Sequence, residues 1–392
     1  MPVYLDYSAS APVLPEVLEV MTDAWRNTPG NAGSRTHAFG TNAARLVSRS
    51  RETVAAVLGV DPTELIFTSG STESNNTAIL GIREFAERSG RNHIVTTAIE
   101  HKSVLEPMRF LESCGFRADF VRPDESGRVR AEDVLGRVTE RTCLVSVMSV
   151  NSETGIMQPV EEIGEELRRR HVLFHVDATQ AFGKLNDEIR HLHYDLMSIS
   201  AHKIGGPQGI GALVRRRNSD FENPPVAQLM YGGGQERGFR PGTVPVALAA
   251  GFAKAAEISE REHEARARRC AQIKRKFLEA ISCFRYETNG DQRYCLPSSI
   301  NVSIDGLDAE AAFLCLRDEY AFSNGSACNA SSHQLSYVLD AMGLSEKRKS
   351  EAIRLSWSGD EDVDFSRFVS VVKKVTQTSQ LKIARKALCG KG

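Results

Sequence analysis

Several short segments of the chain place polar residues directly after an apolar run, where a strand is expected to end. In LIFTSGSTESNN the apolar run meets a Ser/Gly/Thr turn that contains Ser71 and Thr72, and the start of a helix follows. Backbone N–H groups at a helix N-terminus, helped by nearby hydroxyls, bind phosphate oxygens. The same turn is also a good generic helix cap, so this segment indicates a phosphate site only in combination with others.

Two further segments add a carboxylate and an amine. LFHVDATQ contains Asp177, with Gln180 three residues later, and SISAHKIGGPQGIGALV places Lys203 after Ser200 and His202. Burial lowers the pKa of a lysine and prepares it for Schiff-base chemistry. Taken alone, the aspartate could cap the next helix and the lysine could lie on the surface. A phosphate cradle, an aspartate and a lysine in this order are what a pyridoxal phosphate (PLP) site requires, so the combination predicts PLP as cofactor.

Cys328 stands among small and polar residues in FSNGSACNASSHQ. A thiol in such a segment is expected to be exposed and reactive, whereas structural cysteines are usually buried among apolar neighbours. Cys328 is therefore the candidate nucleophile. The chain has eight cysteines, but no CxxC pair and no His/Cys cluster at zinc-ligand spacing, so no metal site is expected.

Length and composition limit the classes of function. The 392 residues suit about two domains, and 49 Lys+Arg nearly balance 50 Asp+Glu. We therefore expect neither nucleic acid nor membrane as a direct partner. The N-terminal MPVYLDYSAS has no basic stretch followed by an apolar one, so no secretion signal is predicted, and we expect a cytoplasmic protein with free thiols.

The elements that must position these residues alternate between strand and helix. From residue 64 to about 213, seven apolar runs are separated by helical patterns, which predicts a mostly parallel α/β sheet with ligands at the carboxyl ends of its strands. One helix is expected over residues 75–88 and a long charged connector helix over residues 253–280. Beyond the connector, SSINVSI, AFLCLRDEY and RLSWS predict a smaller α+β domain.

Nearly the whole chain resembles the cysteine desulfurases, a group of class V aminotransferase-like PLP enzymes. The matching segments are YLDYSASAPVLPEV, NAGSRTHAFG, FTSGSTESNN, AIEHKSV, VNSETGIMQPV, HVDATQAFGK, SAHKIGGPQGIGAL, GGGQERGFRPGT, SNGSACN and IRLSW. The resemblance implies the PLP-dependent transferase fold type I. We expect a large domain at residues 16–255, with a mostly parallel seven-stranded sheet, and a small α+β domain formed by residues 1–15 and 256–392, which carries the Cys328 loop.

The resemblance also implies roles for single residues. Lys203 would bind PLP covalently and later move the Cα proton, Asp177 would keep the ring nitrogen protonated, and His101 would stack on the ring and assist proton transfer. Cys328 would take the sulfur as a persulfide. The other implied contacts are those to the phosphate (Ser71, Thr72, Ser200, His202 and, from a second subunit, Thr243), to the ring hydroxyl (Gln180), to cofactor and substrate (Asn151) and to the substrate carboxylate (Arg354).

The implied reaction converts L-cysteine to L-alanine in a homodimer and passes the sulfur to an acceptor protein. The sequence from Cys328 to SYVLDAMGL resembles the desulfurases with a longer catalytic loop. The acceptor is expected to be an iron–sulfur scaffold or a thiolation or phosphorothioation enzyme, and the divergent flanks point to the desulfurase of a DNA phosphorothioation system. A selenocysteine lyase-like enzyme and a catalytically silent PLP-fold scaffold are the alternatives. The chain departs from the family pattern at residues 7–10 and 241–243, which affects details of pocket shape and dimer loop.

Overall fold

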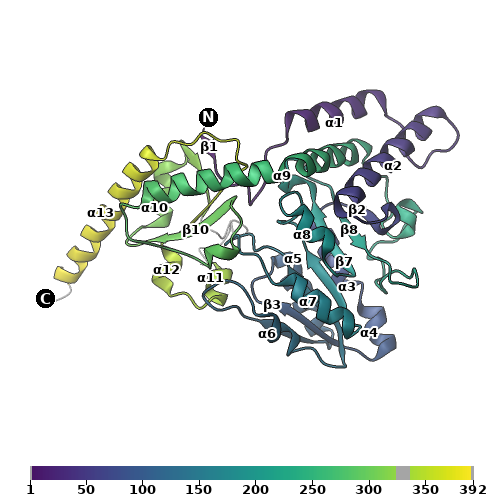
Figure 1. Cartoon of the computed structure of the whole chain (residues 1–392), viewed down its shortest axis with the longest axis horizontal. Coiled ribbons are helices and arrows are strands. Elements are labelled where there is room, and N and C mark those ends of the chain that lie inside the picture. Colours follow the sequence, from purple (N-terminus) through teal and green to yellow (C-terminus); the bar gives the residue numbers. More distant parts are fainter. Residues whose placement is uncertain (1, 324–335, 390–392) are drawn as a thin grey trace.

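A seven-stranded sheet forms the centre of the larger part of the molecule (Figure 1). The structure is a computed structural model that describes residues 2–323 and 336–389, with side chains up to residue 378. The strand order is β2-β8-β7-β6-β5-β3-β4; β8 is antiparallel to both neighbours, and the other pairs are parallel. The mostly parallel sheet expected from the sequence is confirmed. Its strands are β2 (Leu65–Thr68), β3 (His93–Thr97), β4 (Arg117–Val121), β5 (Thr142–Met148), β6 (Leu173–Asp177), β7 (Leu196–Ser200) and β8 (Gly211–Arg215).

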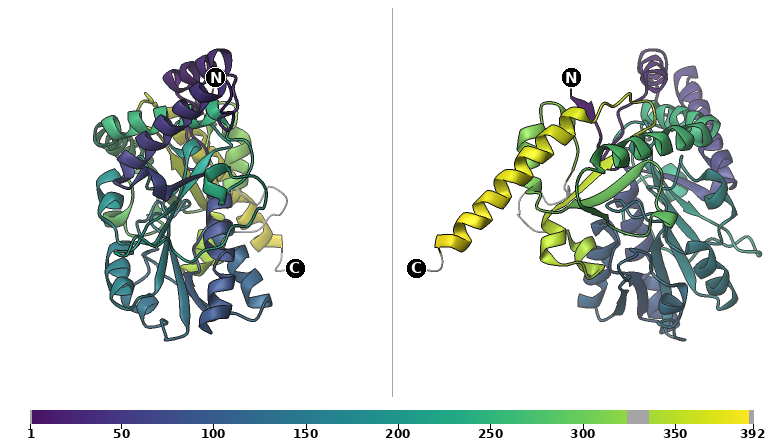
Figure 2. Two further views of the ribbon diagram at one scale, coloured as in Figure 1. Left: turned by 90° about the vertical axis from the view of Figure 1, so that its right-hand side faces the viewer. Right: turned by 60° about the vertical axis from the view of Figure 1, so that its left-hand side comes forward.

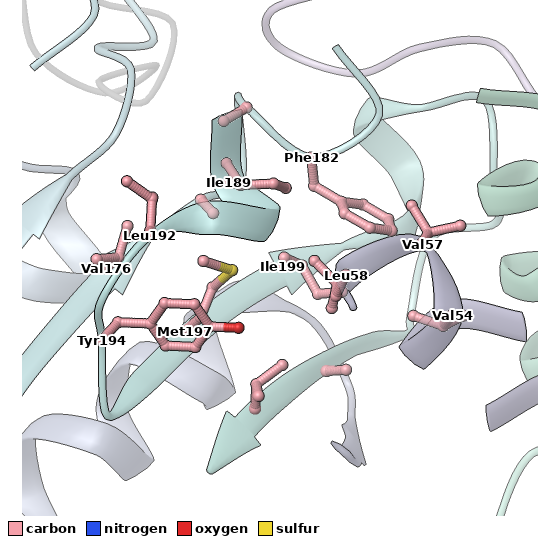
Figure 3. Close-up of a cluster of buried hydrophobic side chains, with 14 of the residues drawn as sticks. Val54, Val57, Leu58, Val176, Phe182, Ile189, Leu192, Tyr194, Met197 and Ile199 are labelled. Atoms are coloured by element: carbon pink, nitrogen blue, oxygen red, sulfur yellow. The ribbon is translucent and has the colours of Figure 1, made fainter. Parts of the chain in front are cut away.

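Helices cover both faces of this sheet because successive strand residues point to opposite sides. Ile94 belongs to one buried cluster and its neighbour Val95 to another, and Leu196 and Met197 divide in the same way. Figure 3 shows part of the second cluster, where Leu58 of α2 meets the sheet. The first face carries α3 (Ser71–Leu80), α4 (Arg83–Ser89) and α5 (Lys102–Ser113), and the second α2 (Ala38–Leu58), α6 (Ala131–Leu135), α7 (Val160–Arg169), α8 (Asn186–His191) and part of α9 (Val246–Ile281).

The single helix expected over residues 75–88 is wrong, because the structure has two helices separated at Gly81. The carbonyl of Gly81 accepts the N–H of Ala227 rather than an N–H one turn further along the chain. The approach of this segment is close: a Cβ at Gly81 would lie 2.5 Å from the carbonyl oxygen of Ala227. A contact between distant parts of the chain therefore ends α3, and the local sequence pattern gave no sign of it.

Helix α9 joins the two parts of the molecule, as its expected role of connector requires (Figure 1). It is longer than expected, because its alanine-rich start at Val246 packs against α1 (Pro15–Asn27) and α2. Phe252 near this end lies in the core under the large sheet, whereas Phe277 near the other end lies in a separate buried cluster. One continuous helix thus fixes how the two clusters sit around the space between them.

The smaller part is built on a three-stranded antiparallel sheet in the order β12-β10-β9. The N-terminal β1 (Val3–Tyr4) also lies in the smaller part, where it pairs in parallel with β11 (Tyr320–Ala321) in a separate two-stranded sheet. The residue boundaries of the two domains remain a prediction. Helix α13 (Ser366–Cys389) extends away from the body in Figure 2. The other elements are β9 (Tyr286–Thr288), β10 (Ser299–Ile304), β12 (Ala352–Ser356), α10 (Ala309–Leu316), α11 (Tyr337–Ala341) and α12 (Glu346–Ser350). Within the described part of the chain, no helix combines the length and apolar character needed to cross a bilayer.

Candidate active site

A cavity of about 380 Å³ brings together most of the residues singled out from the sequence. It lies where β6 ends at Asp177 and where Lys203 follows the end of β7. Ligands of open α/β sheets bind at this edge, because the loops after neighbouring parallel strands meet there. The predicted residues that line the cavity are Ser71, Thr72, His101, Asp177, Gln180, His202, Lys203 and Arg354.

One end of the cavity has the features of an anion site. Gly70, between β2 and α3, has φ 151° and ψ 177°, a conformation that only glycine adopts readily. The turn brings Ser71 and Thr72 to the first positions of α3, and Gly70 supplies no side chain to cap that helix. The two residues that begin this ten-residue helix, each with a backbone N–H and a hydroxyl, therefore line one space. This donor set fits a phosphate group.

Two further residues predicted to bind phosphate lie close to this turn. His202 lines the cavity, and its Nδ1 lies 3.2 Å from the Ser10 hydroxyl. Burial, helped by the charge of Lys203, lowers the pKa of His202 to about 4, so the ring is neutral near pH 7. Ser200 is buried at the end of β7 and is not among the residues that line the cavity.

The amine of Lys203 is held against the N-terminal segment. Lys203 Nζ donates to the backbone carbonyls of Ser8 (2.6 Å) and Ala9 (2.7 Å). Gln180 Nε2 donates to the same Ser8 carbonyl at 2.9 Å, and Lys184 Nζ donates to Gln180 Oε1 at 2.9 Å. Residues 8 and 9 therefore form one wall of the site, although the sequence suggested only that their departure from the family pattern affects pocket shape.

Asp177 and His101 also line the cavity and are joined through two side chains that the sequence did not single out. Asn75 Nδ2 donates to Asp177 Oδ2 and to Ser103 Oγ, both at 2.8 Å, and Ser103 Oγ lies 2.7 Å from His101 Nδ1. The backbone N–H of Thr179 also donates to Asp177, at 3.0 Å. Burial lowers the pKa of His101, while the charge of Asp177 acts in the opposite direction.

Arg354 enters the cavity from β12 and is 3% exposed. Its Nη2 pairs with Asp6 at 2.6 Å, and its Nη1 donates to the carbonyl of Ser152 at 3.0 Å. Its buried Nε has no partner among the described residues. A planar guanidinium with an unused N–H fits a carboxylate ligand, because such pairs commonly form two parallel hydrogen bonds.

Asn151, which the sequence predicted to contact cofactor and substrate, makes hydrogen bonds to the backbone of nearby segments. Its Oδ1 accepts the N–H groups of Glu153 (2.8 Å) and Thr154 (2.9 Å), and its Nδ2 donates to the carbonyl of Ile99 at 2.9 Å. It is 1% exposed, and the lining of the cavity includes its neighbours Val150 and Ser152 instead. Its role toward the cofactor stays a prediction.

Thr243 is exposed and is not among the residues that line the cavity of its own chain. The segment that carries it is nevertheless fixed, because Arg240 makes two hydrogen bonds to Glu73 in the first turn of α3, at 2.9 and 3.2 Å. Glu236, in the same segment, is buried at φ 48°, and its carboxylate accepts from Arg51 and from the N–H of Phe67.

Cys328 lies outside the described residues, but the described residues on both sides of it, Ser323 and Ser336, contact residues that line the cavity. Ser323 and Arg354 exchange backbone hydrogen bonds. After the undescribed segment, Ser336 donates to the buried carboxylate of Glu153, and Tyr337 both lines the cavity and donates to the carbonyl of Glu100 at 2.7 Å.

Sequence reasoning missed two buried acids beside this site. Burial raises the pKa of Glu100, which is fully buried, to about 8 and that of Glu153 to about 7. Glu100 directly precedes His101, and Glu153 lines the cavity. Both stand in segments that matched the family, AIEHKSV and VNSETGIMQPV. The carboxylate of Glu100 accepts from Thr97 and from the N–H of Met148, and that of Glu153 accepts from Ser336, so contacts between distant segments hold both acids and no local pattern predicted their burial.

Comparison with known proteins shows the family to which the chain belongs. Residues 3–357 match the model of the family described as Aminotransferase class-V. A cysteine desulfurase of Homo sapiens is 40% identical over 387 residues, which cover 97% of this chain and 84% of that protein. The solved structure of DndA from Streptomyces lividans is 43% identical with a TM-score of 0.79, and that of SspA in complex with cysteine is 35% identical with a TM-score of 0.79; each match covers 91% of this chain and 99% of the other.

The chain therefore belongs to the class-V aminotransferase family and, within it, to the cysteine desulfurases. Its fold is the PLP-dependent transferase fold expected from the sequence, and PLP is its cofactor. The uncapped start of α3 and the residues around it fit the phosphate of that cofactor, as described above.

Proposed function

We propose that the chain is a PLP-dependent cysteine desulfurase that converts L-cysteine to L-alanine and keeps the sulfur as a persulfide on Cys328. The observation that carries this proposal is the meeting of Lys203, Asp177, His101 and Arg354 in one cavity, beside the described residues that flank Cys328. The similarity to SspA, whose structure was solved in complex with cysteine, supports L-cysteine as the substrate.

The residues of the cavity would divide the binding of cofactor and substrate. The start of α3, with Ser71 and Thr72, would hold the phosphate together with His202 and Ser200, and Gln180 would hold the ring hydroxyl. Asp177 would accept a hydrogen bond from the ring nitrogen. Bound PLP supplies a ring that withdraws electrons from the α-carbon of an amino acid. The observation that supports this division is that Ser71, Thr72, His202, Gln180 and Asp177 line one cavity.

Lys203 and His101 would move protons, and Arg354 would orient the substrate. The amine of Lys203 would bind the cofactor covalently and, once L-cysteine displaces it, would take the Cα proton of the substrate. His101, neutral in its buried setting, would assist this transfer. The guanidinium of Arg354 would bind the substrate carboxylate and so fix which bond of the α-carbon faces Lys203.

The sulfur step would use the thiolate of Cys328. Its sulfur attacks the sulfur of the substrate, an S–S bond forms and the Cβ–S bond breaks. The bonding electrons stay with Cβ, which takes up a proton and becomes the methyl group of alanine. Carbon is reduced and the sulfur of Cys328 is oxidised to the persulfide level, so this step needs no outside oxidant. An acceptor thiol would later remove the outer sulfur.

We also propose the partners and location of the enzyme. Thr243 would bind the phosphate in the second subunit of a homodimer, which agrees with its exposure and with the anchoring of its segment by Arg240 and Glu73. The sulfur acceptor would be a protein, and the 43% identity to DndA supports a phosphorothioation enzyme over an iron–sulfur scaffold. A cytoplasmic location is supported by the six cysteines whose side chains the structure describes, all of which are free thiols.

Absorbance and product analysis of the purified protein test this proposal. The wild type should show the absorption band of lysine-bound PLP and should release alanine from L-cysteine. Lys203→Ala should lose both the band and the activity, whereas Lys184→Ala, which removes a second amine near the site, should keep the band. A yellow wild type that releases no alanine from L-cysteine would refute the desulfurase. A colourless wild type after incubation with PLP would instead favour a silent scaffold.

A further inference from the structure

The hydrogen bonds between Asp177 and His101 can run in only one direction. A carboxylate accepts hydrogen bonds and does not donate them, so the side chain that faces Asp177 must be a donor. Asn75, which is 0% exposed, therefore presents its amide nitrogen to Asp177. The flipped amide would place its oxygen against the carboxylate, with both atoms as acceptors. Asn75 Oδ1 points away and has no partner among the described residues.

The second N–H of the same amide fixes the direction of the next two bonds. It donates to Ser103 Oγ, so Ser103 accepts from Asn75 and its own hydroxyl proton is free for His101 Nδ1, 2.7 Å away. The backbone N–H of Ser103 also donates to His101 Nδ1, at 3.1 Å, because His101 is the capping residue at the N-terminus of α5. Two donors therefore converge on Nδ1, which must be unprotonated.

We propose that Asn75 and Ser103 are positioning residues that hold His101 as the neutral tautomer with its proton on Nε2 and tie its orientation to Asp177. The hydrogen-bonding residues form one connected row, Asp177, Asn75, Ser103 and His101, with distances of 2.8, 2.8 and 2.7 Å. The part of His101 in catalysis rests on the function proposed above, but the tautomer follows from the row itself. In this arrangement only Nε2 can donate a proton toward the substrate.

The row also opposes protonation of His101. A proton on Nδ1 would break the hydrogen bonds from both the hydroxyl and the backbone N–H of Ser103. Among the described residues, the charged groups that act on the ring are Asp177, which favours a proton, and Lys203 and Lys102, which disfavour one. Removing the hydroxyl of Ser103 takes away one of the two opposing donors and changes none of these charges. The ring should then bind a proton more readily.

Nitrogen NMR of the histidine side chains in the PLP-loaded enzyme tests the inference directly. The chain has ten histidines, and the signal of His101 is identified by its loss in His101→Gln. The wild type should show a neutral ring with the proton on Nε2. Ser103→Ala should raise the pKa of His101 by about one unit, which corresponds to the loss of about one hydrogen bond. A wild-type ring with its proton on Nδ1, or an unchanged pKa in Ser103→Ala, would overturn the proposal.

Asn75→Asp gives a second test at almost constant volume. An Asp at position 75 would lie at hydrogen-bond distance from Asp177, and the two buried carboxyl groups would share one proton. The oxygen that faces Ser103 could then only accept, so the serine hydroxyl turns toward it and leaves His101 with one donor. We expect kcat with L-cysteine to fall about tenfold and KM to stay within about twofold in Ser103→Ala and Asn75→Asp, since neither Ser103 nor Asn75 lines the cavity.

A neighbouring variant provides the control for effects on α3. Asn76 lies next to Asn75 and donates to the carbonyls of Thr72 and Ser103. Asn76→Ala should leave the NMR signal of His101 and kcat unchanged. A change in kcat without a change in the signal of His101 in Ser103→Ala would refute the row as its cause. The NMR result does not depend on turnover, so it stays informative even if L-cysteine is not the substrate.

Discussion

Arg354 and Asp6 stand 348 positions apart in the sequence and form an ion pair of 2.6 Å at the edge of the cavity. The bridge between Asp6 and Ser356 places the N-terminal segment beside β12, the strand that carries Arg354. Because Arg354 Nη1 is also bound to the Ser152 carbonyl, a substrate carboxylate has to share this guanidinium with Asp6. The first residues of the chain therefore influence the affinity for substrate.

We expect Asp6→Asn to lower KM for L-cysteine by about fivefold, equivalent to about 1 kcal/mol, with little change in kcat. Asparagine keeps the shape of the side chain and removes the negative charge that competes with the substrate. Steady-state kinetics measure this change. Arg354→Lys should raise KM for L-cysteine, because lysine cannot make the two parallel hydrogen bonds of a guanidinium to a carboxylate. If KM rises in Asp6→Asn, the ion pair orients Arg354 rather than competing with the substrate.

Arg240→Ala should weaken PLP binding by about tenfold. Its two hydrogen bonds to Glu73 join the segment of Thr243 to the first turn of α3, and Glu73 also accepts the N–H of Ser69 at 2.7 Å. Loss of the guanidinium should loosen the phosphate end of the cavity. Fluorescence titration of the apoenzyme with PLP gives the affinity. The control is Arg237→Ala on the same segment, which donates to the Thr63 carbonyl instead. Equal affinities of wild type and Arg240→Ala would contradict the expectation.

Glu100 should make the stability of the enzyme depend on pH. Burial raises the pKa of Glu100 from 4.5 to about 8, so between these values the folded chain holds a proton that the unfolded chain releases. Raising the pH therefore favours unfolding, by up to about 1.4 kcal/mol per pH unit over this range. Glu100→Gln cannot titrate at this position and keeps the oxygen that accepts from Thr97 and Met148. The free energy of unfolding of this variant should therefore fall less per pH unit than that of the wild type.

Thermal unfolding midpoints of the PLP-loaded wild type and Glu100→Gln, measured from pH 5 to 8, test this prediction. The midpoint of the wild type should fall relative to that of Glu100→Gln as the pH rises. Glu84→Gln, which changes an exposed carboxylate paired with Arg88, should follow the wild type. Parallel curves for the wild type and Glu100→Gln would mean that Glu100 is ionised in the folded enzyme.

The strands and the candidate catalytic residues could be predicted because both depend on short stretches of sequence. Apolar runs identified all the strands of the large sheet, and Asp177 and Lys203 stand at strand ends, where parallel topology places ligand sites. The break at Gly81 could not be predicted, since it depends on a distant segment that bonds to its carbonyl. Asn75 and Ser103 look like ordinary helix residues until folding brings them together, 28 positions apart. Asp6 gains its role only through contact with β12.

Transfer of sulfur to Cys328 is the central claim, and mass analysis after a single turnover tests it most directly. Wild-type enzyme incubated with L-cysteine without an acceptor thiol should gain one sulfur atom on the peptide that contains Cys328 and release one equivalent of alanine. Cys328→Ser should stay yellow and lose both products, while Cys315→Ser, which changes an exposed cysteine on α10, should behave like the wild type. Alanine formation in Cys328→Ser at the wild-type rate would contradict the account and favour a lyase that needs no thiol.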